Sequence, residues 1–384
     1  MSSEAFQEFK PVLIEGLDEP DDAGWGEYSL DSIFVRNETR SVSDIVRRID
    51  NGRCILDPEF QRDFVWPEDK QSKLIQSCIM RIPLPVFYLA AEANGKIVIV
   101  DGLQRLTTFH RFVKGEFKLK GLAAIGSGID TNHLEGKTFS QLDIPLQERI
   151  LDTQLITYIL DAKAPERARL DIFERVNSGV PLTRQQMRNA LYSGPATIWL
   201  KEAAAGYQFR TASGGGLDSK TMRDREAINR FCAFFLLGWT SYKSGEMDSF
   251  LASALTAMNK LSSSQLAKLR QLFEISMRLN RATFGDHAFR KSLATPFSAR
   301  RQVLNIALFD VCSVSFAELH QEISSGPATL DKVRHAFSTL IGDKSFSKSI
   351  TYSTNSTQAV ATRFEMSQLF LRQVVPAHNL SNFR

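Results

Sequence analysis

The chain is poor in the residues and patterns that define several protein classes. Only four of its 384 residues are cysteines, and Cys54, Cys78, Cys232 and Cys312 are far apart. This spacing indicates neither a disulfide framework nor a zinc knuckle, so we interpret the four as core thiols. No apolar stretch approaches the length of a membrane span, and the polar, acidic N-terminus is not typical of a signal peptide. We therefore expect a cytoplasmic protein without membrane contact.

Three motifs that carry chemistry are incomplete. Gly136-Lys137-Thr138 matches the end of a P-loop, but Thr131 stands where that motif needs its first glycine. Asp286-His287 and His378-Asn379 resemble fragments of a metal-dependent nuclease site, yet no histidine has a second ligand at a useful spacing. Carboxylates such as Asp310 and Glu318 fall on different helix faces, which does not favour acid/base chemistry. We accordingly predict no metal site in the protein.

Charge divides the chain into an acidic and a basic half. Residues 1–190 hold 24 Lys and Arg against 29 Asp and Glu, about −5, whereas residues 191–384 hold 23 against 14, about +9. The densest basic cluster surrounds Pro296 and consists of Arg290, Lys291, Arg300 and Arg301. Such a cluster predicts contact with the DNA phosphate backbone, although charge of this size also serves simply to solvate a surface. No motif that reads bases accompanies it.

Hydropathy patterns predict an α+β domain followed by a mostly helical one. Residues 1–40 form an acidic segment that we expect to wrap the surface or stay mobile. Residues 41–195 alternate short helices and strands, with strands expected at 82–89, 97–100 and 155–160. Residues 196–384 are basic and helical after a loop at 213–216, with periodic segments at 228–237, 261–279, 303–319 and 364–375.

One segment has the order of elements found in anion sites. An apolar run at 97–100 predicts a buried strand, and Asp101-Gly102 then leads into a helix that carries Gln104 and Arg105 in its first turn. Free N–H groups and the positive end of the helix dipole attract a phosphate at such a junction. We place Thr108 with Gln104 and Arg105 on the polar face of this helix. The alternative is a plain turn before a core helix whose apolar face is Leu103, Leu106, His110 and Val113.

A second segment has a similar mixture of side chains. Residues 57–67 place Gln61, Arg62 and Trp66 in a loop bounded by prolines, and Pro67 suits the start of the next helix. These residues form a second part of the predicted cleft. The alternative is that the aromatic residues belong to the core and that Arg62 is solvated.

Three ordered motifs resemble the N-terminal domain family of GmrSD-type modification-dependent restriction enzymes. They are DPEFQRDFVWPEDKQSKLIQSCIMRIPLPVFYL, VDGLQRLTTFHRF and IFERVNSGVPLTRQQMRNALYSG, within residues 40–195. The family's Asp-Gly-Gln-Gln-Arg signature falls on residues 101–105, with Leu103 where a Gln is usual. Its Arg-x-Asn-x-Gly segment falls on Arg175, Asn177 and Gly179. Physically, Asn177-Ser178-Gly179 also fits a helix C-cap, with Thr183 capping the next helix.

The resemblance implies a ParB/sulfiredoxin-like fold and a nucleoside triphosphate with Mg²⁺ as the ligand, in a protein of phage defence or DNA processing. On this hypothesis Asp101, Gln104 and Arg105 act on the phosphates. The ligand is also contacted by residues of all three motifs: Gln61, Arg62, Trp66, Gly102, Thr108 and Asn177. Because Leu103 lies on the apolar helix face, the change from Gln tunes packing or a ligand contact and makes hydrolysis an open question. Two alternatives are a non-enzymatic DNA-sensing module that recruits a separate nuclease or defence subunit, and a ParB-like DNA nickase.

Overall fold

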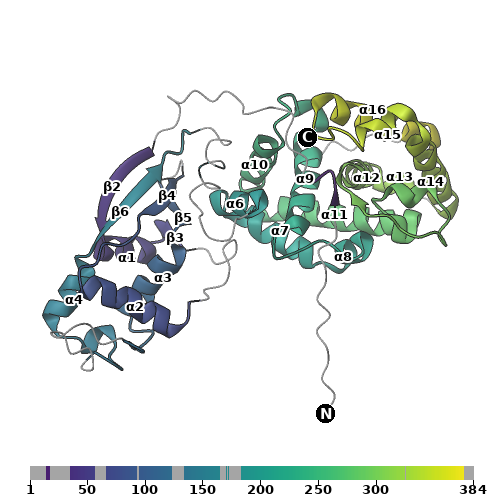
Figure 1. Cartoon of the computed structure of the whole chain (residues 1–384). Coiled ribbons are helices and arrows are strands. Elements are labelled where there is room, and N and C mark those ends of the chain that lie inside the picture. Colours follow the sequence, from purple (N-terminus) through teal and green to yellow (C-terminus); the bar gives the residue numbers. More distant parts are fainter. Residues whose placement is uncertain are drawn as a thin grey trace, which may run out of the picture. The chain divides into compact units, whose positions relative to one another are not determined.

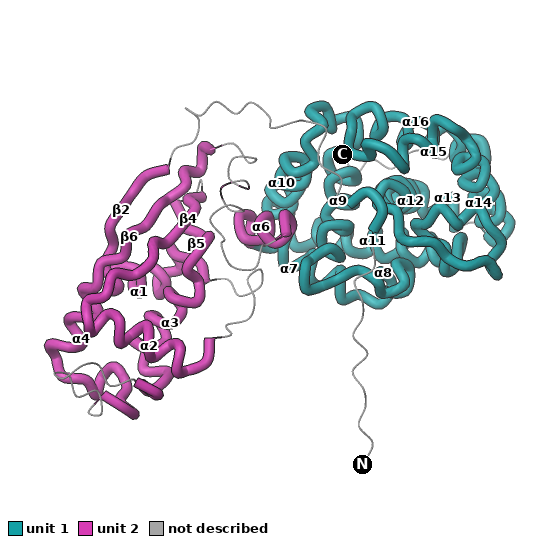
Figure 2. Tube along the Cα trace, in the orientation of Figure 1, with its two compact units in different colours: residues 1–26, 194–384 teal, residues 27–193 magenta. Residues whose placement is uncertain are grey.

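The structure is a computed structural model of the whole chain, and it divides into two compact units (Figure 2). Unit 2 comprises residues 27–193, and unit 1 comprises residues 1–26 and 194–384. The structure describes residues 14–17, 35–56, 66–92, 95–122, 134–164, 170, 172, 183–324 and 326–375. It is α+β, as predicted: a mixed sheet lies in unit 2, and unit 1 is mostly helical.

The sheet of unit 2 has five strands in the order β2-β6-β4-β5-β3 (Figure 1). Their bounds are β2 (Val35–Ser41), β3 (Cys54–Ile55), β4 (Phe87–Ala91), β5 (Ile97–Asp101) and β6 (Gln154–Leu160). β4 runs parallel to β6 and antiparallel to β5, with a bulge between Tyr88 and Leu89. Residues 97–100 of β5 are all buried, which explains the continuous apolar run there.

Helices cover one face of this sheet and form the core with it. They are α1 (Val42–Asp50), α2 (Glu68–Ile79), α3 (Leu103–Val113) and α4 (Ile144–Leu151), with η4 (Phe139–Gln141) before α4. The core packs Ile45, Ile75 and Leu106 of the helices against Phe87 and Ile99 of the strands, among others. The last helix, α6 (Arg184–Leu191), packs against β5 and begins with the predicted cap, in which the Thr183 hydroxyl accepts from the N–H of Gln186.

Three strands of unit 2 differ from the sequence expectation, and one of them, the short β3, was not predicted at all. β4 begins at Phe87 rather than Ile82, because Pro83 and Pro85 have no N–H to donate to a neighbouring strand. β2 lies partly within the segment that we expected to wrap the surface, and it pairs along its whole length with β6. Its exposed, polar residues give no alternating pattern, so only the pairing reveals it.

Unit 1 is a set of packed helices. They are α7 (Pro195–Ala205), α8 (Tyr207–Ser213), α9 (Arg223–Leu237), α10 (Met247–Met258), α11 (Ser263–Phe284), α12 (Ile306–Glu318), α13 (His320–Ile323), α14 (Pro327–Gly342), α15 (Lys344–Ser349) and α16 (Thr357–Val374). Three short 3₁₀ turns join them, η5 (Trp239–Ser241), η6 (Gly285–His287) and η7 (Lys291–Ala294). β1 (Ile14–Glu15) pairs in parallel with β7 (Leu304–Asn305) in the same unit.

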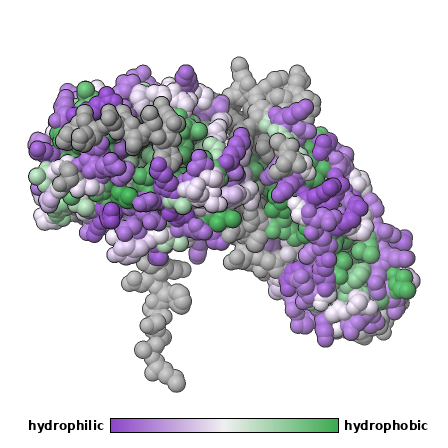
Figure 3. Space-filling view, turned by 180° about the vertical axis from the view of Figure 1, so that it is seen from behind, coloured by the Kyte–Doolittle hydropathy of each residue, from purple (hydrophilic) through white to green (hydrophobic). Residues whose placement is uncertain are grey.

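The cores contain both apolar and charged side chains. All four cysteines are buried and free, which confirms the interpretation as core thiols. Asp310 is fully buried in unit 1, where its carboxylate accepts from Arg230 at 2.6 and 2.9 Å and from Arg363 at 3.0 Å. Its role is therefore structural. Apolar side chains also reach the surface among polar ones in both units (Figure 3), and Val35 and Ile156 of the sheet are each 44% exposed.

Candidate functional site

The turn between β5 and α3 depends on a single glycine. Gly102 has a φ of +103°, which side chains of L-residues rarely adopt, and it serves as the N-cap of α3. A Cβ at this position would lie less than 3.0 Å from Cδ1 of Phe87 on β4 and 3.3 Å from Nη2 of Arg105. The close approach fixes where α3 begins relative to β4 and β5, so we call this place the β5–α3 junction (residues 101–105).

The side chain of Arg105 connects this junction to the main chain before β4. Its guanidinium donates to the carbonyl oxygens of Pro85 and Val86 at 2.5 and 3.1 Å, and to Oδ2 of Asp101 at 2.9 Å. It also lies over the Phe87 ring, 4.2 Å from the centroid, and its side chain is only 12% exposed. Burial lowers the pKa of Arg105, and the Asp101 carboxylate partly offsets this effect. The side chain thus holds the Pro-rich loop before β4 in place.

The beginnings of two helices meet at this junction. Oε1 of Gln104 in α3 accepts from the N–H of Trp66 at 3.3 Å, one residue before the N-cap of α2. Gly102 has no side chain with which to cap α3, and the first N–H groups of a helix have no acceptor within it. The positive ends of both helix dipoles therefore lie near Gln104, in a position that suits an anion.

The remaining predicted residues of unit 2 occupy different positions. Leu103 is 7% exposed and packs in the core, which confirms its assignment to the apolar face. Trp66 packs partly buried against the same core, with Lys70 4.5 Å above its ring. The placement of Thr108 on the polar face was wrong: it is fully buried, and its hydroxyl donates to the Gln104 carbonyl. Gln61, Arg62, Arg175, Asn177 and Gly179 lie outside the described residues.

The apolar face of α3 also differs from the expected set of core residues. Leu106, Phe109 and Phe112 are fully or almost fully buried, whereas His110 is partly exposed and contacts the Asp50 carboxylate at 3.1 Å. His110 is thus not a core residue, because a polar partner on α1 holds its ring at the edge of the apolar face.

The predicted basic cluster of unit 1 has a buried and an exposed part. Arg290 is 4% exposed and donates to the carbonyl oxygens of Ala288 and Ser213, both at 2.6 Å. Burial, and next the positive charge of Arg301, lower the pKa of Arg290 to about 10. Lys291 forms an ion pair with Glu15. Arg300 and Arg301 are exposed, and neither forms an ion pair with a described residue.

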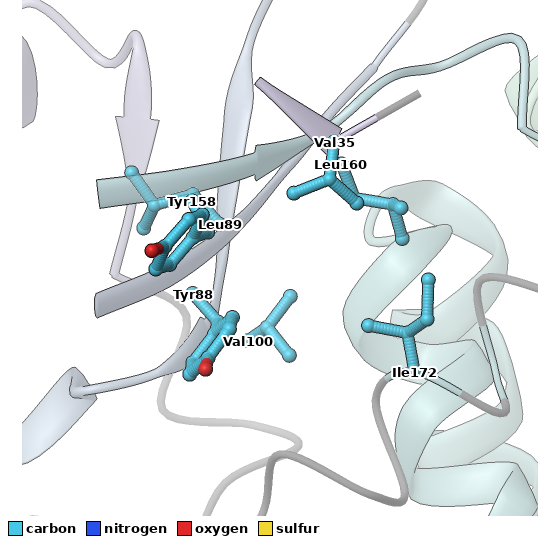
Figure 4. A pocket seen from close by; sticks show the side chains of 7 residues that line it. All are labelled: Val35, Tyr88, Leu89, Val100, Tyr158, Leu160 and Ile172. Atoms are coloured by element: carbon cyan, nitrogen blue, oxygen red, sulfur yellow. The ribbon is translucent and has the colours of Figure 1, made fainter. Parts of the chain in front are cut away.

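A cavity that no sequence motif predicts lies on the other face of the sheet, and we call it the sheet cavity. It has a volume of about 260 Å³ and is lined by Val35, Tyr88, Val100, Tyr158, Leu160 and Ile172, with Leu89 behind them (Figure 4). Tyr88 and Tyr158 are register partners on the parallel strands β4 and β6. The sequence places one tyrosine in each of two predicted strands, but it does not predict that these strands pair.

Within the described ranges, no three His, Cys, Asp or Glu side chains gather where they could hold a metal ion. Nor is any helix there long and apolar enough to span a membrane.

The fold and this junction define unit 2 as an α+β domain with a strand, a glycine turn and a helix start at its candidate site. Residues 42–193 match the model of a family described as the GmrSD restriction endonuclease, N-terminal domain. The match covers the three motifs up to Ser193 and confirms the resemblance drawn from them. No curated protein and no solved structure matches the chain.

Proposed function

We propose that residues 42–193 form a nucleoside-triphosphate-binding module of a restriction-type defence protein, with the phosphates held at the β5–α3 junction. The family match supports the restriction or defence setting. The contact between Gln104 and the N–H of Trp66 carries the proposal for the ligand, because it brings the starts of α2 and α3 together. Amides at two helix starts favour a group with several negative charges, as a polyphosphate has.

The side chains around the junction have distinct roles in this proposal. Arg105 holds the turn at Gly102 in place and adds positive charge next to it. The main-chain N–H groups in the first turn of α3 bind the phosphates. The Asp101 side chain is 34% exposed and bonds to Arg105 through Oδ2. One carboxylate suits Mg²⁺, which keeps several waters and binds mainly through substrate phosphates. Mg²⁺ would neutralise phosphate charge, and any hydrolysis would rest on charge stabilisation and orientation.

Gln104→Glu is a sharp test of the phosphate site. The new carboxylate keeps an oxygen for the N–H of Trp66 and suits the start of a helix, so the fold should be as stable as before or slightly more so. The same charge repels phosphates. In calorimetry with each triphosphate and Mg²⁺, we expect the variant to bind at least about tenfold more weakly than the unaltered protein.

Gln154→Glu is the matched control, since it makes the same charge change at an exposed position at the start of β6. It should leave the affinity unchanged. If no triphosphate binds to the unaltered protein, or if the two variants bind equally well, the phosphate site is wrong.

A second function is supported by Arg300 and Arg301. Exposed guanidinium groups beside the buried Arg290 concentrate positive charge on unit 1, and such charge binds the DNA backbone without reading sequence. In this proposal the protein holds DNA and brings a separate nuclease or defence subunit to it.

The ParB-like fold, nucleotide hydrolysis and the identity of a partner remain predictions.

A further inference from the structure

The chemistry of the sheet cavity differs from that of the β5–α3 junction. Its described lining has aliphatic side chains and two phenol rings, and no charged side chain. A phosphate or carboxylate placed there would lose its hydration without gaining a partner. A nucleobase, by contrast, has ring faces that pack on apolar and aromatic side chains, and ring nitrogens and substituents at its edge that hydrogen-bond. The hydroxyls of Tyr88 and Tyr158 have no hydrogen bond to a described residue, so they suit the polar edge of such a ring.

The size of the cavity favours one small ring system. Its volume of about 260 Å³ lies below the roughly 300–1,000 Å³ of sites that take drug-sized ligands. Ile172 faces the strands across the cavity and limits its depth (Figure 4). The cavity is therefore suited to a nucleobase rather than to a longer ligand.

The two tyrosines form one aromatic surface. Their ring centroids are 5.6 Å apart with an interplanar angle of 22°, which is the geometry of two rings in direct contact. A base cannot enter between them, but it can stack on the surface that they share. Aromatic side chains on the open face of a sheet bind bases in this way in several nucleic-acid-binding folds.

The cavity and the junction lie at the same end of β5. Val100 lines the cavity, and the next residue, Asp101, begins the junction. Tyr88 of the cavity is also the register partner of Asp101 across β4 and β5. One sugar joins the base and the phosphates of a mononucleotide, so the two sites are placed as a single nucleotide requires.

We infer that the sheet cavity holds the base of the nucleotide whose phosphates bind at the β5–α3 junction. This inference rests on the proposed function, and it adds the part of the site that recognises the base. Tyr88 and Tyr158 stack against the base, and their hydroxyls contact its edge.

The test compares a nucleoside triphosphate with inorganic tripolyphosphate, which has the phosphates and no base. We expect Tyr158→Leu to weaken triphosphate binding by about 5- to 150-fold, the range of one base stack, and to leave tripolyphosphate binding unchanged. Tyr158→Phe keeps the ring and should retain most of the affinity. Tyr207→Leu is the matched control, because Tyr207 is 77% exposed in unit 1. Gln104→Glu should weaken both ligands.

Three results would overturn the inference. Triphosphate binding that is insensitive to Tyr158→Leu would show that the base lies elsewhere. Equal losses for both ligands would show that the ring acts on the junction or on folding. If Tyr158→Leu instead impairs only binding of a single-stranded DNA oligonucleotide, the base comes from a strand and not from the nucleotide. By contrast, an unaltered protein that binds neither triphosphate nor tripolyphosphate contradicts the proposed function itself.

Discussion

Gly102→Ala tests whether the β5–α3 junction depends on the close approach of its backbone to Phe87. The change adds a Cβ less than 3.0 Å from Cδ1 of Phe87, a fully buried ring in the core. It also forces an L-residue to a φ of +103°. Positive φ costs about 1–2 kcal/mol for a residue other than glycine, and overpacking costs about 1–3 kcal/mol. The unfolded chain of the alanine variant has less conformational freedom to lose, which offsets about 0.4–1 kcal/mol, so we expect a net loss of stability of about 1–5 kcal/mol.

Gly115→Ala is the control at the other end of α3. Gly115 also has a positive φ, +75°, but a Cβ there would meet nothing within 4 Å. The conformational cost is therefore shared by the two variants, and the contact with Phe87 belongs to Gly102→Ala alone. We expect Gly115→Ala to cost about 0–2 kcal/mol.

Hydrogen exchange of the full chain, followed by mass spectrometry, measures this difference locally. Peptides from β4, β5 and α3 should open more readily in Gly102→Ala, whereas peptides from α9 in unit 1 should exchange as before. Replacing Phe87 by Leu in the same chain should recover part of the loss, as a double-mutant cycle would show. Equal effects of the two glycine variants, or no coupling with Phe87, would refute the reasoning.

Two further predictions concern unit 1. The double variant Arg300→Glu with Arg301→Glu should lower the slope of log affinity for DNA against log salt concentration by up to about 2. Lys344→Glu with Arg372→Glu makes the same charge change elsewhere and should leave that slope unchanged. Gel shifts across a salt series measure the slopes, and binding that does not depend on salt would exclude contact with the DNA backbone. Burial raises the pKa of Asp224 to about 6 from 3.8, so its contribution to folding stability falls as pH rises from about 4 to 6. Asp224→Asn should therefore raise the free energy of unfolding at pH 7.5 by up to about 3 kcal/mol and leave it nearly unchanged below pH 4; melting temperatures that shift equally at both pH values would contradict this.

The sequence by itself determined the elements around the candidate site. The apolar run at 97–100, the Asp-Gly turn and the helical spacing after it predict β5, Gly102 and α3 at the places where they occur. Leu103 could be assigned to the core for the same reason, because helical periodicity fixes which face a residue occupies. The Thr183 cap and the buried cysteines followed from local chemistry as well. These are all short-range effects, which depend on neighbours within one or two turns.

Only the tertiary structure decided which of these side chains are available to a ligand. Arg105 donates to carbonyl oxygens 20 and 19 residues away, and Arg290 to one 77 residues away, so each guanidinium group holds a distant segment of the main chain in place. Thr108 is fully buried, which its position on its own helix beside Gln104 and Arg105 does not reveal. The pairing of β4 with β6 sets Tyr88 beside Tyr158, and no local pattern connects two strands so far apart in the chain. The positions of Arg105, Thr108, Tyr88 and Tyr158 are therefore set by strand pairing and packing between distant segments. The identity of a residue limits which bonds its side chain can form, whereas the fold decides which partners lie within reach.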